Sequence, residues 1–297
     1  MSNKLRKMTL EKKHNLTGWA FLAPATFLIA VFSFWPMIKA LVLSFQTGKG
    51  RNMQMAGFTN YIRMFQDDVF IQSIKNTFFY FIIQVPIMLV VALVLACILN
   101  KKDLRFKGFF RTMIFLPCTT SLVAYSIIFR SLFANNGLVN YVLVNLGILD
   151  KPYNFLTQPF AAKMVILLGL LWRWTGYNMV FFLSGLQNIE YSVYEAAKID
   201  GASAIQTFFK ITVPLLKPTI LLTAIMSTNG TLQLFDESVN LTDGGPANAS
   251  ISMSHYIYNL CFKYVPNFGY AAAMSFFILL LVAVLAFIQM RVGDKRD

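Results

Sequence analysis

The sequence contains six apolar blocks, each long enough to cross a lipid bilayer as a helix. About 20 predominantly apolar residues are needed to span the hydrocarbon core. The cores of five blocks carry no charge, and the block at 161–186 carries only Lys163 near its start and Arg173 near its middle. The predicted spans are approximately residues 16–40, 77–99, 110–130, 161–186, 214–235 and 269–290. We therefore expect an all-α polytopic membrane protein in which residues 1–297 form a single transmembrane domain.

Composition supports this fold class. Apolar residues make up 57% of the chain and charged residues 13%, whereas a soluble domain carries about 25% charge. The basic N-terminus followed by an apolar block resembles a signal peptide. The block is longer than the roughly 7–15 residues of a signal h-region, and no small-residue cleavage site follows it. We therefore expect this block to remain as the first helix.

The distribution of lysine and arginine predicts the orientation, because cytoplasmic loops carry an excess of them. With six spans, both termini and the loops after the second and fourth spans share one side. That side holds sixteen basic residues, Lys4, Arg6, Lys7, Lys12, Lys13, Lys101, Lys102, Arg105, Lys107, Arg111, Lys198, Lys210, Lys217, Arg291, Lys295 and Arg296. The other side holds nine: Lys39, Lys49, Arg51, Arg63, Lys75, Arg130, Lys151, Lys163 and Lys263. We expect the first side to be cytoplasmic. The net charge of +13 then reflects topology and contact with anionic headgroups rather than nucleic-acid binding.

The residue types needed for catalysis or metal binding are not arranged in a recognisable site. Cys97, Cys118 and Cys261 lie far apart, with no metal-ligand spacing. His14 and His255 have no neighbours that complete a ligand set. The sequence lacks a glycine-rich loop ending in Gly-Lys-Ser or Gly-Lys-Thr. We expect no catalytic residue, no metal and no nucleotide bound by a P-loop of this chain.

A polar segment at 190–212 lies between the fourth and fifth spans. Residues 191–200 are good helix formers, and Gly201 can adopt the positive φ that ends a helix. A second short helical piece follows at 202–210, and Pro214 restricts the chain where the fifth span begins. The segment is predicted to be a helix–turn–helix knob between two rigid spans, suited to transmitting a push. The alternative interpretation is an ordinary amphipathic cytoplasmic loop.

The same segment resembles the cytoplasmic signature of the membrane-spanning subunits of ATP-binding-cassette importers. The resemblance rests on Glu195-Ala196-Ala197, then Gly201, then Ile211-Thr212-Val213-Pro214. Val213 replaces the leucine usual in the family. The resemblance implies that the segment forms a short coupling helix that docks onto a cytosolic ATPase. The implied coupling residues are Glu195, Ala196, Ala197, Asp200, Gly201, Ile211 and Pro214.

Two external segments are similar to those of the carbohydrate branch of this family. One is Gly57-Phe58-Thr59-Asn60-Tyr61 before the second span, and the other is Thr242-Asp243-Gly244-Gly245-Pro246 after the fifth. The resemblance extends from the first span through the sixth and is closest to the maltose-type and multiple-sugar-type inner-membrane components. Unlike the maltose-type permease, this chain lacks extra N-terminal helices and a large external insertion.

Polar and aromatic clusters in the middle of the fourth and fifth spans predict a substrate path. A polar group inside a spanning helix is costly and usually faces a cavity or another protein group. Aromatic faces stack on sugar rings, and amides and hydroxyls bond sugar hydroxyls. The candidate path residues are Arg173, Trp174, Gly176, Tyr177, Asn178, Ser227, Asn229, Gly230, Thr231, Gln233 and Leu234. Within this set, the family motif carries over Trp174, Gly176, Ser227, Gly230, Thr231 and Leu234. The alternative is helix packing through Gly176, Ser227 and Gly230.

Arg173 leaves two interpretations open. It lies near the middle of its predicted span, where a charge is expensive unless it finds water or a partner. It either pairs with an acidic or carbonyl group of this chain or of a partner, or lines the path and binds an anionic substrate group. The second outcome would favour acidic sugars.

The resemblance implies a permease subunit of an ATP-driven carbohydrate importer in a bacterial inner or plasma membrane. Its implied partners are a second permease subunit, two copies of a cytosolic ATPase that bind ATP and magnesium, and an external or periplasmic solute-binding protein. No cofactor is expected in this chain. The alternatives are the same machinery importing an acidic sugar or glycerol phosphate, and an ion-coupled secondary transporter. The spans show no mid-helix acidic residue that would carry protons or sodium.

Overall fold

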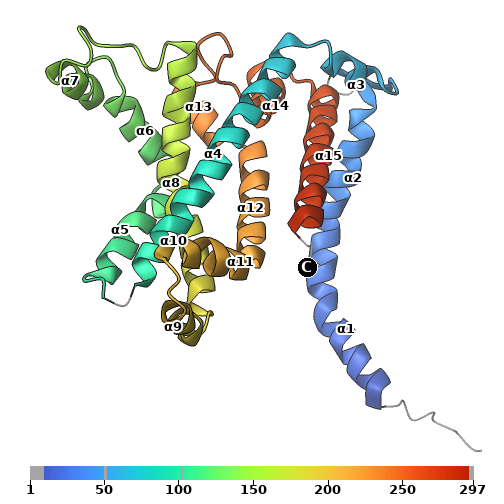
Figure 1. The fold of residues 1–297 in the computed structure, drawn as a ribbon. Coiled ribbons are helices and arrows are strands. Elements are labelled where there is room, and N and C mark those ends of the chain that lie inside the picture. Colours follow the sequence, from blue (N-terminus) through green and yellow to red (C-terminus); the bar gives the residue numbers. More distant parts are fainter. Residues whose placement is uncertain (1–9, 50–51, 102, 294–297) are drawn as a thin grey trace, which may run out of the picture.

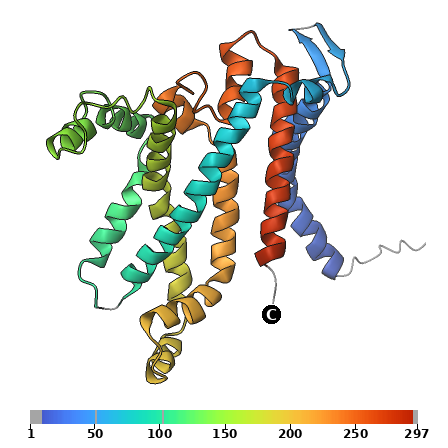
Figure 2. The same ribbon diagram turned by 45° about the horizontal axis from the view of Figure 1, so that its top comes forward.

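The structure, a computed structural model, describes residues 10–49, 52–101 and 103–293. It is almost entirely helical, with one two-stranded hairpin (Figures 1 and 2). The first elements are α1 (Leu10–Ile29), the π-helical turn η1 (Ala30–Phe34), α2 (Trp35–Ser44), β1 (Gln46–Lys49), β2 (Asn52–Met55), α3 (Thr59–Met64), α4 (Asp68–Asn100), α5 (Lys107–Thr119), α6 (Leu122–Leu132) and α7 (Leu138–Asn145). They are followed by α8 (Pro159–Gln187), α9 (Tyr191–Ile199), α10 (Ala204–Thr207), η2 (Phe208–Thr212), α11 (Val213–Leu215), α12 (Lys217–Leu232), α13 (Asp236–Thr242), α14 (Met253–Tyr258), η3 (Asn259–Lys263) and α15 (Phe268–Gly293).

The described residues contain four helices long and apolar enough to cross a membrane: His14–Ser44, Asp68–Asn100, Pro159–Gln187 and Phe268–Gly293. Two further candidates are bent pairs, Lys107–Thr119 with Leu122–Leu132 and Ala204–Leu215 with Lys217–Leu232. The number of spans is therefore four, rising to six if each bent pair crosses once. Some basic residues used for the orientation, namely Lys4, Arg6, Lys7, Lys102, Lys295 and Arg296, lie outside the described residues.

The third expected span, residues 110–130, is divided into two helices. α5 and α6 meet at an angle of 98°. Pro117 in the last turn of α5 has no N–H to continue the helix, and Thr120 and Ser121 adopt ψ angles of 148° and 137°. The Thr120 hydroxyl donates to the Pro117 carbonyl at 2.7 Å. The apolar pattern predicted the length of this segment but not its break, because proline is tolerated inside membrane helices.

The fifth expected span, residues 214–235, is shorter as a continuous helix. α12 begins after a bend of 70° at the short turn around Leu216, with Pro218 in its first turn. It ends at Leu232, and residues 233–235 connect it to α13. A break therefore lies at each end of α12.

α4 and α8 pack along each other, and α5 and α12 flank this pair. Gly176 on α8 has the backbone of Ile114 on α5 directly above its Cα, with no room for a Cβ atom. Small residues let membrane helices approach this closely, and close approach is their main source of packing energy. The sequence left Gly176 open between substrate contact and packing, and its contacts here are those of a packing residue.

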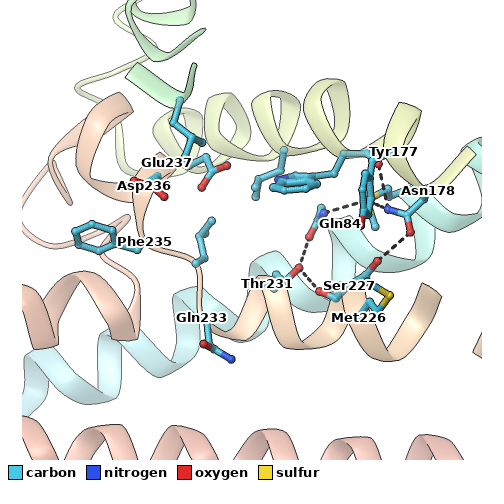
Figure 3. Close-up of a pocket in the computed structure, with 16 residues that line it drawn as sticks. Gln84, Tyr177, Asn178, Met226, Ser227, Thr231, Gln233, Phe235, Asp236 and Glu237 are labelled. Atoms are coloured by element: carbon cyan, nitrogen blue, oxygen red, sulfur yellow. Dashed lines mark hydrogen bonds between the residues drawn. The ribbon is translucent and has the colours of Figure 1, made fainter. Parts of the chain in front are cut away.

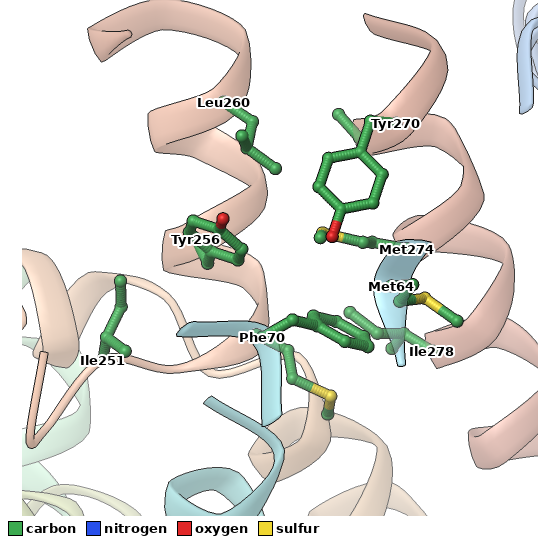
Figure 4. Packing of buried hydrophobic residues seen from close by; sticks show 10 residues of the cluster. Met64, Phe70, Ile251, Tyr256, Leu260, Tyr270, Met274 and Ile278 are labelled. Atoms are coloured by element: carbon green, nitrogen blue, oxygen red, sulfur yellow. The ribbon is translucent and has the colours of Figure 1, made fainter. Parts of the chain in front are cut away.

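A second apolar cluster holds α3, α4, α14 and α15 together at one end of the molecule (Figure 4). The Asp67 carboxylate lies beside it and accepts hydrogen bonds from the Tyr256 and Tyr270 hydroxyls, each at 2.7 Å. Its other oxygen accepts from the backbone N–H groups of Val69 and Phe70, which caps α4. Burial raises the pKa of Asp67, but these four hydrogen bonds outweigh burial and lower it below its usual value.

The helical rod formed by α1, η1 and α2 contacts little else in the described part of the chain. Between residues 14 and 43 no side chain is buried. Only its last part is attached, where α2 packs against α15 and the Asn60 amide donates to the carbonyls of Ser44 and Gln46 at 2.9 and 2.7 Å. Its apolar surface must be covered by lipid or by another subunit.

The packing of Gly176 gives a test of the fold. Gly176→Leu should destabilise the protein by at least about 1–3 kcal/mol, because the new side chain would force α5 away from α8. Gly108→Leu is the matched control, because no atom lies within 4 Å of a Cβ added at Gly108. Thermal unfolding of the purified membrane protein, followed by size-exclusion chromatography, should show a loss for Gly176→Leu alone. Equal melting temperatures for the two variants would contradict this packing.

Candidate functional site

A cavity of about 300 Å³ lies between α4, α6, α8 and α12 and reaches the connection from α12 to α13. Figure 3 shows its walls. Sixteen residues line it: Gln84, Met88, Leu122, Leu170, Trp174, Tyr177, Asn178, Met226, Ser227, Gly230, Thr231, Gln233, Leu234, Phe235, Asp236 and Glu237. The lining combines apolar surface with a few convergent polar groups, which is typical of a small-molecule site.

One wall of the cavity is a connected polar network. The Thr231 hydroxyl lies 2.6 Å from the Gln84 side-chain oxygen and 2.9 Å from the Ser227 carbonyl, so it has two acceptors for its one proton. The Ser227 hydroxyl donates to the Asn178 side-chain oxygen at 3.3 Å, and the Asn178 amide donates to the Trp174 carbonyl at 3.0 Å. These bonds fix the orientation of the amides and leave part of their hydrogen-bonding capacity for a ligand.

Aromatic rings lie beside this network in the lining. Trp174 and Tyr177 meet edge to face, with ring centroids 5.7 Å apart, and both are partly exposed to the cavity. Phe235 borders the cavity near its end at α13. An aromatic face beside amides and hydroxyls matches the amphipathic surface of a sugar ring, which has apolar C–H faces and a polar rim.

The end of the cavity at α13 is acidic. Asp236 and Glu237 form the first turn of α13 and both line the cavity (Figure 3). Glu237 is buried, with 4% of its surface exposed. Burial raises the pKa of Glu237, the neighbouring Asp236 adds to the rise, and the Arg173 guanidinium opposes it.

The structure brings together most of the path residues expected from sequence. Eight of them line the cavity: Trp174, Tyr177, Asn178, Ser227, Gly230, Thr231, Gln233 and Leu234. Three lie elsewhere. Gly176 faces α5, and Arg173 lies at the break between α5 and α6. The Asn229 side-chain oxygen accepts from the Gln233 amide, and Asn229 lines a second cavity between α12, α14 and α15.

Arg173 is buried, with 6% of its surface exposed, and its guanidinium is directed at backbone carbonyls. Its Nη1 lies 2.9 Å from the Thr120 carbonyl and 3.5 Å from that of Pro117, and its Nη2 lies 3.4 Å from the Cys118 carbonyl. Because α5 ends there, the Cys118 and Thr120 carbonyls have no following helical turn to bond them, whereas the Pro117 carbonyl also accepts the Thr120 N–H. Of the two outcomes considered from sequence, the geometry matches pairing with carbonyl groups of this chain.

Several lining residues were not among the sequence candidates: Gln84, Met88, Leu122, Leu170, Met226, Phe235, Asp236 and Glu237. Gln84 carried a usable signal, because a buried amide in the middle of the apolar helix α4 usually faces a polar partner. The apolar residues carried none, since nothing in their pattern separates a cavity wall from lipid contact.

The segment at 190–212 forms the predicted pair of helical pieces. Gly201 has a φ of 76°, and the N–H groups of Gly201 and Ala202 donate to the carbonyls of Lys198 and Ala197. This is a Schellman motif, which ends α9 with a left-handed residue. Ser203 and Gln206 then form a reciprocal capping box that starts α10.

This segment presents apolar side chains to solvent. Ile199, Ile205 and Phe209 are 86%, 71% and 64% exposed. Of the predicted coupling residues, Glu195, Ala196, Asp200, Gly201 and Pro214 are exposed, Ile211 is half-buried and Ala197 is buried. Tyr194 anchors α9 with its hydroxyl 3.4 Å from that of Thr212 in η2. A fixed helix with an exposed apolar surface is suited to docking against another protein.

Within the described ranges, no group of three or more His, Cys, Asp or Glu side chains is placed to hold a metal ion.

Comparisons with known proteins agree on one family. Residues 69–296 match the family described as the binding-protein-dependent transport system inner membrane component. The lactose transport system permease protein LacF of Rhizobium radiobacter is 51% identical over 292 residues, covering 98% of both chains. The multiple sugar-binding transport system permease protein MsmF of Streptococcus mutans is 33% identical, covering 97% of this chain and 99% of its own. A crystal structure of a bacterial ABC transporter involved in the import of the acidic polysaccharide alginate has a similar fold, with a TM-score of 0.85 and 23% identity over 97% of this chain and 98% of its own.

The contacts of Arg173 predict its effect on stability. Arg173→Lys and Arg173→Gln should each destabilise the protein by about 1–3 kcal/mol, because neither side chain can reach three diverging carbonyls as a guanidinium does. Arg130→Gln is the matched control, since Arg130 is exposed on α6. Thermal unfolding of the purified protein should separate the buried arginine from the exposed one. Wild-type stability of both Arg173 variants would show that the break holds without the guanidinium.

Proposed function

The chain belongs to the family of binding-protein-dependent transport system inner membrane components, and we propose that it is the permease subunit of an ATP-driven sugar importer. A multi-pass membrane protein of this family is a transport component and not an enzyme. The observation that carries the proposal is the cavity between α4, α8 and α12, in which aromatic rings lie beside amides and hydroxyls. The names of the relatives LacF and MsmF support a sugar as the transported solute.

In this proposal the sugar contacts the cavity through two kinds of surface. Trp174 and Tyr177 stack on the apolar face of a ring, and Gln84, Asn178 and Ser227 exchange hydrogen bonds with its hydroxyls. The cavity is open along part of its wall, which suits a solute that passes through. A polar lining at the depth of the membrane replaces the water that the sugar loses.

The proposed assembly supplies what this chain lacks. One chain provides half of a translocation path, so a second permease subunit completes it. Two cytosolic ATPases bind ATP and magnesium and provide the energy. A solute-binding protein delivers the sugar to external loops at 46–76 and 236–268. The likeness to an alginate transporter solved with its substrate-bound periplasmic protein supports such a docking partner.

The proposed coupling element is the segment at 190–212. α9 joins α8 through a short turn, and η2 and α11 lead directly into α12. α8 and α12 are two of the helices that form the cavity, so displacement of this segment by an ATPase would act on both cavity walls. Its exposed apolar side chains, Ile199, Ile205 and Phe209, would form the contact.

The proposed topology has six spans, at approximately 16–40, 77–99, 110–130, 161–186, 214–235 and 269–290. Both termini and the coupling segment face the cytosol of a bacterial cell. Support comes from the excess of basic residues on that side, and from the common position of α9, α10 and α11 and the described C-terminal end of α15 in one half of the molecule (Figure 1).

A glycine substitution tests the coupling. Gly201→Asp should abolish sugar uptake and sugar-stimulated ATP hydrolysis in the reconstituted complex, because a side chain at φ 76° disrupts the Schellman turn and crowds the docking surface. Gly147→Asp is the matched control, with a φ of 70° and open space in the external loop before α8. Solute capture by the binding protein should be normal in both. Normal uptake by Gly201→Asp would refute the coupling role.

Accessibility of introduced cysteines tests the topology. In a variant without its native cysteines, Lys198→Cys should resist a membrane-impermeant thiol reagent added to intact cells, whereas Lys151→Cys should react. Both positions are exposed in the structure, so any difference reports the side of the membrane. After permeabilisation both should react. Efficient labelling of position 198 in intact cells would reverse the orientation.

A further inference from the structure

The charges on the cavity wall all have one sign. Asp236 and Glu237 are the only acidic or basic side chains among the sixteen described residues that line it. Both belong to the first turn of α13, immediately after the chain leaves α12. Figure 3 shows them at one end of the cavity, near Phe235, with Gln84, Tyr177 and Asn178 at the other.

Arg173 does not line the cavity, and its charge already acts on Glu237 of this chain. Its two terminal nitrogens are directed at the carbonyls of Pro117, Cys118 and Thr120. Its guanidinium carbon also lies 5.3 and 5.6 Å from the ring centroids of Tyr125 and Trp174, which enclose it. Turning the guanidinium into the cavity would remove the donor from the carbonyls of Cys118 and Thr120 at the break between α5 and α6.

Two lysines on the same half of the molecule are also engaged with other groups. Lys263 pairs with Asp243 at 2.8 Å in an exposed loop contact. Lys163 lies 5.5 Å from the ring centroid of Phe79. Neither lines the cavity. An anionic solute would therefore meet carboxyl groups without a compensating cation from the described lining.

The free-energy cost of placing an anionic solute beside these carboxyl groups depends on how far they are shielded from water. Charges in a partly buried site interact more strongly than in water, because less solvent screens them. Burial and the neighbouring Asp236 already raise the pKa of Glu237. A negative charge on the solute would raise this pKa further. Neutral sugars have the opposite effect, since their hydroxyls donate to carboxylate oxygens in charge-assisted hydrogen bonds.

We propose that Asp236 and Glu237 are specificity-determining residues that make this cavity accept uncharged sugars and reject sugar acids. The proposal rests on the sugar-importer function and narrows its substrate class. It excludes the alternative in which Arg173 binds a substrate carboxylate. A similar fold occurs in an importer of an acidic polysaccharide, so the distinction lies in the lining side chains and not in the fold.

The test compares paired ligands on the complete importer without its solute-binding protein, so that selection by the binding protein does not contribute. The neutral ligands are lactose, maltose and melibiose, and each is paired with its counterpart oxidised to a carboxylate at one C6. Saturation-transfer NMR on the complex in lipid nanodiscs measures binding of each. The wild type should bind the carboxylates at least about tenfold more weakly than their neutral partners.

Three variants locate the effect. Asp236→Asn and the double variant Asp236→Asn/Glu237→Gln should reduce this gap to less than about threefold, because amides keep hydrogen bonding and remove the charge. Asp150→Asn is the matched control, an exposed carboxylate in the loop before α8 and outside the cavity, and should leave the gap unchanged. Asp236 is only half-buried, so its single variant remains informative if the double variant is unstable.

The outcomes separate this inference from the function on which it rests. Equal binding of neutral and acidic partners by the wild type would overturn the charge selection, while sugar transport would stand. A gap that persists in Asp236→Asn and in the folded double variant would also overturn the assignment to these residues. If the panel of neutral sugars does not bind and is not imported, the sugar-importer proposal itself fails, and the inference fails with it.

Discussion

The structure depends on one constraint, that backbone polar groups inside a bilayer must find partners within the protein. Straight helices such as α4 and α8 meet it without help. Where a membrane-length segment breaks, helical bonds are lost, and at two of these breaks a side chain from elsewhere in the chain bonds the backbone. Arg173 supplies donors to the carbonyls around Thr120, and the Ser252 hydroxyl donates to the carbonyl of Leu234.

These two breaks also create the cavity. The first sets α6 at 98° to α5, which brings Leu122 to the cavity wall. The second ends α12 at Leu232, and the connection that follows brings Asp236 and Glu237 to the cavity. The same irregular backbone that is costly in lipid thus brings polar groups to the cavity, and we propose that the charge of those groups selects the solute.

The segment at 190–212 is not subject to this constraint, because water can form hydrogen bonds with its backbone. Its shape comes from local signals, the Schellman turn at Gly201 and the capping box at Ser203. Exposed apolar side chains such as Ile199 match the proposed docking of another protein on this surface. This explains why the segment could be predicted closely from sequence, down to the positive φ of its glycine.

The sequence by itself determined the helical membrane architecture, the two helical pieces at 190–212 and half of the residues that line the cavity. Apolar length and local turn chemistry are written in consecutive residues, and the polar clusters around Asn178 and Ser227 stood out against apolar surroundings. Only the tertiary structure decided the role of Arg173, the packing of Gly176 and the contribution of Gln84. Each of these depends on which atom of a distant segment lies opposite. The break at Thr120 is an example, because Pro117 is compatible with a straight or a bent helix. The bend is stabilised by Arg173, which lies 53 residues further along the chain and donates to the Thr120 carbonyl.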